Sequence, residues 1–295
     1  MKSLSELTSE ILKSHSSAKR KAEALVKLGV TPYEAMVLAK ASIMPATRKE
    51  RVKKFTFTFG VEIECVHCPR YPFMDAASAK GLTVLNQGYN HTDIAQYKLV
   101  SDGSLTGENS VECVSPALNG NKSGFESLKK CCDALGEVGA TVNRSCGLHV
   151  HIGAASLSEE AYCNVFVNYQ KLEKVIDSFM ALSRRGNNNT YSKSLQRYNL
   201  DGVYARSELN YRIGDTRYLK VNAQAWSRHR TIEFRQHQGT INFDKIKAWV
   251  TFLGKLVEWS RENRLTAPIA EIDDIPFLTQ TEKNYFKTRK TALNG

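Results

Sequence analysis

The chain has 295 residues, an ordinary hydrophobic fraction of 42% and a net charge of +11, which is enough for one large domain or two smaller ones. No apolar run approaches the roughly 18 residues of a membrane helix, and the N-terminal MKSLSELTSE lacks the apolar core of a signal peptide. Seven cysteines, an odd number that includes the adjacent Cys131 and Cys132, favour free thiols over a disulfide framework. We therefore expect a cytoplasmic protein with no membrane partner.

The positive charge is concentrated in two segments. Residues 1–54 carry twelve Lys or Arg against five Asp or Glu, and residues 184–230 carry ten against three. The rest of the chain is therefore slightly acidic. A uniformly basic nucleic-acid-binding protein does not show this pattern, so we expect two local sites for anions.

Residues 1–54 predict a basic helical extension. The stretch SSAKRKAEALVKLG ends in Gly29, a common helix stop. Thr31-Pro32-Tyr33-Glu34 then has the order of a capping box with proline at the first helical position, so a second helix is expected through PYEAMVLAKAS, ending before Pro45. Such a pair resembles a DNA-binding helix-turn-helix, but a helical hairpin that docks on its own protein or on an acidic macromolecular partner is the favoured interpretation.

Residues 55–295 mix short strands with longer helices. The expected strands are FTFTFGVEIE, the hairpin LVSDGSLTGENSVECVSPAL, GLHVHIG, YLKVNAQ and TIEFRQHQ. Amphipathic helices are expected in FESLKKCCDALGEVGA, in SLSEEAYCNVFVNYQKLEKVIDSFMAL after a Ser158 cap, and in DKIKAWVTFLGKLVEWSREN. The polar RRGNNNTYSKSLQRYN is expected to be a loop. This mixture predicts an α+β fold.

The strand FTFTFGVEIE has an unusual polar face. Alternation places its phenylalanines, Val61 and Ile63 on one face and Glu62 and Glu64 on the other. The two carboxylates would stand about 7 Å apart, where like charges repel unless a cation lies beside them. The alternative is a solvated edge strand.

Three further strands repeat this pattern. The polar residues are His149 and His151 in HVHIG, Glu112 in VECV, and Glu233, Arg235 and His237 on one face of TIEFRQHQ. Each motif alone is more often a hydrogen-bonded or ionic pair than a metal site. If the four strands line one sheet face, however, that face is a polar cavity whose carboxylates need cations.

Carboxylates outnumber imidazoles on these strands, which favours a hard divalent ion such as Mg²⁺ or Mn²⁺ over zinc. Such an ion commonly bridges substrate phosphates. The basic loop with Arg184, Arg185 and Arg197 would supply cations for a triphosphate or a carboxylate. Because no P-loop or GxGxxG motif is present, a nucleotide would be held by metal and arginine.

The order of the motifs FGVEIE, DGSL followed by VECVSP, CGLHVHIG, SRR and TIEFRQHQGT resembles the amidoligase family. That family is a branch of the carboxylate–amine ligases related to glutamine synthetase and glutamate–cysteine ligase. The resemblance runs from Phe57 to Trp259 and implies a glutamine-synthetase-like catalytic domain, with a curved antiparallel sheet forming a partial barrel backed by helices. It also implies ATP, two or more Mg²⁺ ions, and a carboxylate and an amine as substrates. The carboxylate would form an acyl phosphate, from which the amine displaces phosphate to leave an amide.

The resemblance further implies a role for each matching residue. Five residues would be metal ligands: Glu62, Glu64, Glu112, His149 and Glu233. Asp102 would complete the coordination or orient the amine, and His151 would face the phosphates or the substrate. Arg235 would neutralise the transferring phosphoryl group or the substrate carboxylate, and one of Arg184 and Arg185 would contact phosphate.

Two other functions fit parts of the sequence. A metal-dependent hydrolase would use the same carboxylates and H-x-H pair to activate water, without ATP. A nucleic-acid-binding or scaffold protein would act through the basic N-terminal helices and would be indifferent to Glu62 and Glu64. The repeated polar faces favour an enzyme. The C-x-x-C of Cys65 and Cys68 and the single Cys146 are interpreted as structural thiols.

Overall fold

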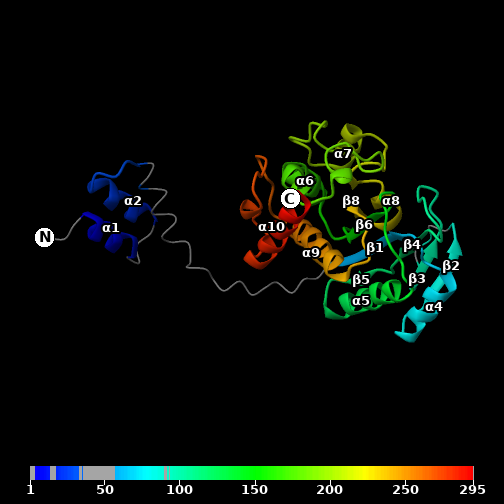
Figure 1. Cartoon of the computed structure of the whole chain (residues 1–295). Coiled ribbons are helices and arrows are strands. Elements are labelled where there is room, and N and C mark those ends of the chain that lie inside the picture. The colour runs from blue at the N-terminus through cyan, green and yellow to red at the C-terminus, as the bar shows by residue number, and fades with distance from the viewer. Residues whose placement is uncertain are drawn as a thin grey trace. The chain divides into compact units, whose positions relative to one another are not determined.

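A computed structural model describes residues 4–13, 18–32, 35, 57–89, 92 and 94–294, and the chain divides into two compact units, residues 1–54 and 55–295 (Figure 1). In the first unit, α1 (Leu4–Lys13) and α2 (Ala18–Lys27) share a small apolar core around the buried Leu25. The chain leaves α2 through Gly29, whose φ of 92° is a conformation that glycine adopts readily. Most of the predicted helix PYEAMVLAKAS lies outside the described residues.

The second unit has the predicted α+β fold. Its described residues form one open sheet of eight strands in the order β2-β3-β4-β1-β6-β8-β7, with β5 paired to β1. The strands are β1 (Thr58–Cys65), β2 (Val84–Gly88), β3 (Tyr97–Val100), β4 (Val111–Val114), β5 (Leu118–Asn119), β6 (Gly147–Gly153), β7 (Val221–Asn222) and β8 (Thr231–Gln238). Within this described sheet, β2 and β3 are parallel and the other neighbours are antiparallel. A glutamine-synthetase-like partial barrel remains a prediction.

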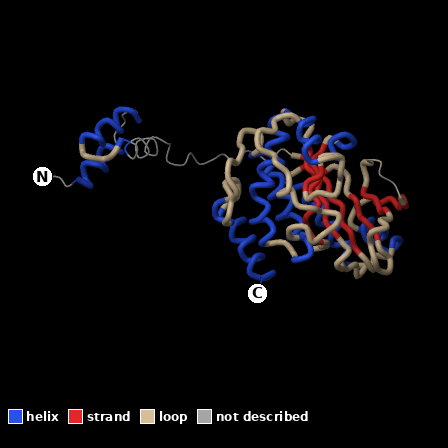
Figure 2. The backbone as a smooth tube through the Cα atoms, turned by 90° about the horizontal axis from the view of Figure 1, so that it is seen from above, coloured by secondary structure: helices blue, strands red, loops and turns tan. Residues whose placement is uncertain are grey.

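Several helices gather along one side of the strands (Figure 2). The described helices of this unit are α4 (Arg70–Ala79), α5 (Lys122–Glu137), α6 (Glu159–Ser178), α7 (Arg206–Ile213), α8 (Ala225–His229), α9 (Phe243–Trp259) and α10 (Gln280–Asn294), with short 3-10 turns at Leu182–Arg184 and Ile272–Asp274. The side chains of Asn121, Ser158 and Asn242 cap α5, α6 and α9. Among the described residues, none of the helices has the length and apolar character needed to cross a membrane.

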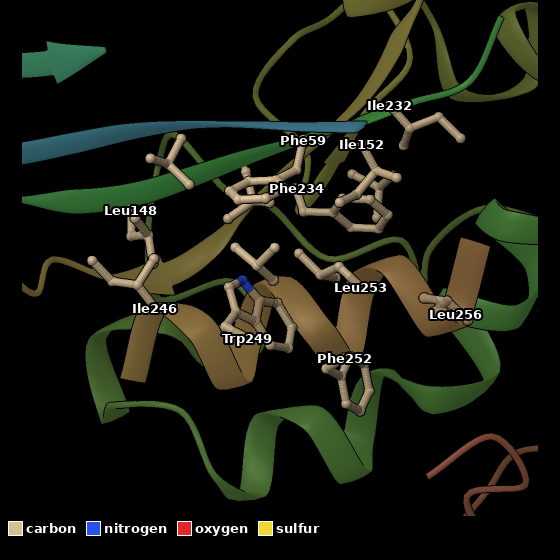
Figure 3. Close-up of a cluster of buried hydrophobic side chains, with 14 of the residues drawn as sticks. Phe59, Leu148, Ile152, Ile232, Phe234, Ile246, Trp249, Phe252, Leu253 and Leu256 are labelled. Atoms are coloured by element: carbon tan, nitrogen blue, oxygen red, sulfur yellow. The ribbon is translucent and has the colours of Figure 1, made fainter. Parts of the chain in front are cut away.

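The apolar face of the sheet is buried against α9 (Figure 3). Phe59, Leu148, Ile152 and Phe234 project from β1, β6 and β8 and meet Trp249 and other apolar residues of the helix. Because side chains alternate along a strand, this packing turns the intervening residues to the opposite face. The helix layer thus fixes which side of the sheet carries the polar residues.

Strand register sorts the side chains of the opposite face into three rows. The rows are Glu112 and Glu64; Lys98, Val114, Glu62 and His149; and Gly60, His151, Glu233 and Asn222. Directly opposite residues in an antiparallel pair lie about 4.5–5.5 Å apart. Residues far apart in the sequence therefore become neighbours, as the sequence pattern predicted for Glu62, Glu64, Glu112, His149 and Glu233.

One strand departs from simple alternation. On β6 and β8, Leu148 pairs with His237 and Val150 pairs with Phe234, so β8 has one extra residue between these positions. This bulge turns His237 to the apolar face, where its ring centroid lies 5.8 Å from that of Trp249. The prediction that His237 shares a face with Glu233 and Arg235 is wrong for this reason.

Candidate metal and substrate site

A cavity of about 660 Å³ opens on the polar face of the sheet, within the size range of small-molecule sites. Seven predicted site residues line it: Glu62, Asp102, Glu112, His149, His151, Glu233 and Arg235. Loops and the short helix α8 add Tyr191, Arg217 and Arg228 to its walls. The cavity therefore combines carboxylates, imidazoles and guanidinium groups.

Glu62 is held between the two histidines of β6. Nδ1 of His149 donates to one carboxylate oxygen of Glu62 at 2.9 Å, and Nε2 of His151 donates to the other at 3.2 Å. Burial raises the pKa of Glu62, but these hydrogen bonds and the charges of the histidines outweigh it and hold the pKa well below its usual value. Burial lowers the pKa of His151, but the hydrogen bond and charge of Glu62 outweigh it and raise the pKa.

His149 lies at the centre of two groups of ligand atoms. Its Nε2 is 3.6 Å from a carboxylate oxygen of Glu64, and its Nδ1 is 3.7 Å from one of Glu233. In the group of Glu62, His149 and Glu233, and in the group of Glu64, Glu112 and His149, one ligand atom from each residue lies within 4.8 Å of the others. Each group has the spacing of a metal site.

The donor set fits a hard divalent cation, because carboxylate oxygens dominate it. Glu64 and Glu112 stand directly opposite one another, and both are buried. Burial raises the pKa of Glu112, and the nearby charges of Glu62, Glu64 and Asp102 raise it further. A cation beside these carboxylates would relieve the repulsion.

Glu233 is fixed from two sides. Arg235 Nη1 donates to one carboxylate oxygen, and Asn222 Nδ2 donates to the other. Burial raises the pKa of Glu233, but the charges of Arg235 and His151 outweigh it and lower the pKa. The carboxylate is thus kept ionised and oriented at the cavity wall.

Arg184 reaches the site from the basic loop. It lines a smaller cavity of about 60 Å³ together with Glu64, His149 and Arg235. The side chain is buried, Nη2 donates to the Cys146 carbonyl at 2.6 Å, and Nε has no hydrogen-bond partner among the described residues. Of the arginines predicted in the basic loop, Arg184 is therefore the one that lies at the site.

Gly147 makes this close approach possible. A Cβ atom at this position would lie 3.1 Å from Nε2 of His149, and 3.3 Å from both Glu64 Oε2 and Arg184 Nη1. Its backbone N–H also donates to Glu64 Oε2 at 2.5 Å. The absence of a side chain lets three charged or polar groups converge on one point.

Arg185 and Arg197 lie elsewhere. Arg185 donates to the Met180 carbonyl at 2.8 Å and to Asn294 at 2.7 Å, which ties the loop to α10. The guanidinium carbon of Arg197 lies 4.7 Å from the ring centroid of Tyr198. Neither side chain lines the two cavities around His149, so the structure does not bring these two predicted cations to the site.

Sequence analysis missed several residues that the structure places in the site. Arg217, Arg228 and Asn222 line the large cavity. The signal available in the sequence was the excess positive charge of residues 184–230, which marks the segment but does not select its residues. The cysteines add no chemistry there: all seven are buried free thiols, and burial raises the pKa of Cys146.

Comparison with known proteins identifies the family. The sequence profile of the family described as "putative amidoligase enzyme" matches residues 56–206 and 201–257. These ranges contain every strand of the described sheet and all the predicted site residues. No curated protein matches the chain. Since the matched residues span well over half of the sequence, the chain belongs to the amidoligase family.

Proposed function

We propose that the protein is an ATP-dependent carboxylate–amine ligase that forms an amide bond through an acyl phosphate at a site for two divalent metal ions. Membership of the amidoligase family supports a ligase. The observation that carries the proposal is the pair of carboxylate–imidazole groups that share His149. They face a cavity that also holds Arg217, Arg228 and Arg235, and such a combination suits a metal-bound polyphosphate.

Each group of ligands would hold one ion, and His149, which belongs to both groups, would be a ligand of only one ion at a time. Glu62, His149 and Glu233 form the first group, and Glu64 and Glu112 with His149 form the second. Mg²⁺ or Mn²⁺, when bound, would supply positive charge that neutralises the transferring phosphoryl group. The hydrogen bonds to Glu62, Glu64 and Glu233 would keep the carboxylates oriented toward the ions.

The cations of the cavity would bind the phosphates. Arg235 stands beside Glu233 on β8, and Arg217 and Arg228 line the same cavity. The raised pKa of His151 favours its protonated form, whose positive charge would attract a phosphate or the substrate. These cations would stabilise the negative charge that moves during transfer.

The proposed reaction has two displacement steps. An oxygen of the substrate carboxylate attacks the γ-phosphorus of ATP, and the bond to the β-phosphate oxygen breaks to release ADP. The amine nitrogen then attacks the acyl carbon, and inorganic phosphate leaves with the bonding electron pair. The proton lost by the nitrogen goes to a carboxylate, for which we propose Asp102 at the cavity wall.

The proposal is tested by calorimetric titration of a non-hydrolysable ATP analogue, with and without Mg²⁺. We expect binding that requires Mg²⁺ and is lost in Glu62→Gln/Glu64→Gln, because the substitution removes two ligand charges. The matched control is Glu126→Gln/Glu137→Gln, which removes two exposed carboxylates of α5. Absence of binding at millimolar concentration, or binding that ignores Mg²⁺, would contradict a ligase and favour a hydrolase or a scaffold.

A further inference from the structure

A buried lysine lies between the sheet and helix α6. Lys220 directly precedes β7, and its side chain is fully buried. Its ammonium group donates to Glu173 Oε1 at 2.9 Å and to Asp177 Oδ1 at 2.6 Å, and these two acidic residues stand one turn apart on α6. We call the three residues the ionic triad. None of them is among the described residues that line the two cavities around His149.

Stability alone does not account for the triad. Moving charged groups from water into a protein core costs free energy, and a buried ion pair is often no more stabilising than apolar residues of the same volume. Apolar residues, however, cannot accept hydrogen bonds from the backbone N–H groups of a loop, and such groups need acceptors when they are buried. The carboxylates of the triad provide these acceptors.

The two carboxylates hold the loop that follows α6. Asp177 Oδ2 accepts a hydrogen bond from the Gly186 N–H at 2.8 Å, and Glu173 Oε2 accepts one from the Leu195 N–H at 2.9 Å. Between these two points the loop carries Tyr191, which lines both cavities, and Arg184 stands two residues before Gly186. The triad therefore anchors the loop at both ends of the segment that reaches the site.

The backbone of Lys220 holds two further segments. Its N–H donates to the Lys193 carbonyl at 2.8 Å, and its carbonyl accepts from the Arg235 N–H at 2.9 Å. Arg217, three residues before Lys220, lines both cavities, as does Arg235. One residue thus joins α6, through its side chain, to the chain segments that carry Arg217 and Arg235.

We propose that Lys220 is a positioning residue for the cationic wall of the site, defined here as Arg184, Arg217 and Arg235. The ammonium group holds Glu173 and Asp177 with their second oxygens turned toward the loop, and it does so without touching a ligand. Without it, two carboxylates one turn apart in the core repel each other, and the loop loses its anchors. The proposal rests on the proposed function for the identity of the ligand as a nucleotide, whereas the anchoring is a property of the free protein.

The anchoring is tested on the full chain by hydrogen–deuterium exchange and mass spectrometry, without ligand. In Lys220→Met, peptides that span residues 186–195 should exchange about tenfold faster than in wild type, because the anchored amides lose their acceptors. The control is Leu128→Ala on α5, which also destabilises the core but lies outside the triad and both cavities. It should leave the exchange of these peptides unchanged.

Asp177→Asn provides a second variant in case Lys220→Met does not fold. Asp177 Oδ1 also accepts from Gln236, so an asparagine would turn its single oxygen toward Lys220 and Gln236. Its amide nitrogen would then face the Gly186 N–H, which cannot donate to it. Exchange should therefore be faster at the Gly186 end of the loop, with less effect at Leu195.

The positioning is tested by calorimetric titration of the ATP analogue with Mg²⁺, at a temperature at which each variant is folded. Lys220→Met should bind about tenfold more weakly than wild type, which is the effect of one misplaced charged hydrogen bond. Asp177→Asn should also bind more weakly, and Leu128→Ala should bind as wild type. A purely structural role of Lys220 would lower the stability of the fold and leave the affinity of the folded protein unchanged.

Unchanged loop exchange in both triad variants would overturn the anchoring. Faster exchange with unchanged affinity, or an equal loss of affinity in Leu128→Ala, would overturn the positioning. The two measurements also separate this proposal from the ligase. If wild type binds no nucleotide but the loop is released in Lys220→Met, the anchoring stands and the ligase falls. If wild type and Lys220→Met bind the nucleotide equally well, the positioning falls alone.

Discussion

Glu64 and Glu112 stand directly opposite one another on neighbouring antiparallel strands, an arrangement in which like charges destabilise a sheet. Both side chains are buried, so water screens their repulsion poorly. This repulsion lowers the stability of the folded chain at the position where sequence and geometry both indicate a cation. Charge repulsion in the metal-free protein is therefore a measurable property of the site.

Glu112→Gln is expected to raise the free energy of unfolding of the metal-free protein by about 1 kcal/mol, because it removes one of two facing charges while keeping the side-chain shape. Urea unfolding in the presence of a chelator measures this. Adding Mg²⁺ should stabilise wild type more than the variant. A variant that is less stable than wild type in chelator would show that Glu64 and Glu112 do not repel.

His237 gives the protein a specific acid sensitivity. Burial lowers the pKa of His237 to about 3, from an ordinary value of 6.5. As the pH falls below about 6.5, the unfolded chain binds a proton that the folded chain excludes, so stability decreases by up to about 1.4 kcal/mol per pH unit until about pH 3. His237→Phe keeps a ring against Trp249 and should flatten this dependence between pH 7 and 4. If the free energy of unfolding depends on pH equally in the variant and in wild type, this prediction is contradicted.

Individual site residues differed in how well they could be predicted. Glu62, Glu64 and His149 followed from alternation, because a strand with a buried apolar face must turn its other residues to the opposite side. Arg217 lies in a loop and Arg228 lies in a short helix. In such segments no repeating pattern in the sequence indicates the direction in which a side chain points. Arg185 matched a motif, yet its side chain is engaged by α10, a contact that depends on the end of the chain.

At the level of elements, the bulge in β8 joins the site to the helix layer. Its residue Gln236 is fully buried, accepts a hydrogen bond from Tyr169 of α6, and donates to Asp177 and, at 3.2 Å, to the Arg184 carbonyl. Arg235, the neighbouring residue, lines the cavity. The strand β8 therefore positions Arg235 directly, and the side chain of its Gln236 holds the backbone of Arg184.

Gln236→Leu should destabilise the protein by about 2 kcal/mol, since buried polar groups of α6 lose their partner. It should also weaken binding of the ATP analogue, because the backbone of Arg184 loses a hydrogen bond. Urea unfolding and calorimetry measure the two effects. The exposed Gln280→Leu on α10 is the control and should change neither, and a Gln236→Leu protein with wild-type stability would contradict the argument.

The predictability of elements followed their local signals. The helices α5, α6 and α9 were predicted from their 3.6-residue period and, for α6, its Ser158 cap, and β1, β6 and β8 from alternation. The expected hairpin is confirmed: the strands β3 and β4 are antiparallel and are joined by residues 101–110. The parallel pair β2–β3 was missed because β2 was not among the expected strands. The bulge was missed because one inserted residue has no local signature.

At the scale of the whole molecule, the two compact units have separate cores. The apolar core of the second unit, as far as the structure describes it, contains only residues from Phe57 onward. Residues 1–54 contribute a disproportionate share of the positive charge. Folding and catalysis should therefore depend on the second unit, and long-range attraction of anions should depend more on the first.

Removal of residues 1–54 is expected to leave the thermal unfolding midpoint of the remaining chain within about 2 °C of wild type and to preserve binding of the ATP analogue. It should weaken binding to heparin columns and lower the salt needed for elution, since seven net positive charges are lost. Differential scanning calorimetry and chromatography measure these effects. Loss of nucleotide binding on truncation would show that the two units function together.

The overall plan could be predicted only in part. The α+β class and helix backing follow from periodicity, and the family follows from the motif order. Whether the sheet closes toward a barrel depends on its twist and on the pairing of its outer strands, such as β2 and β7. The sequence motifs do not include these outer strands. The composition shows two positively charged segments, residues 1–54 and residues 184–230. It does not show the function of the first of them.

His149 belongs to both candidate ligand groups, and this sharing has a consequence for how ions bind. A neutral imidazole has one lone pair available for a metal, because its other ring nitrogen bears a hydrogen. Two ions cannot use His149 together, so one of them must depend on carboxylates and on oxygens brought by the substrate. Titration of the free protein with Mn²⁺ should therefore be biphasic, and the weaker phase should tighten when the ATP analogue is present. The nucleotide would then arrive with the second ion rather than find it in place.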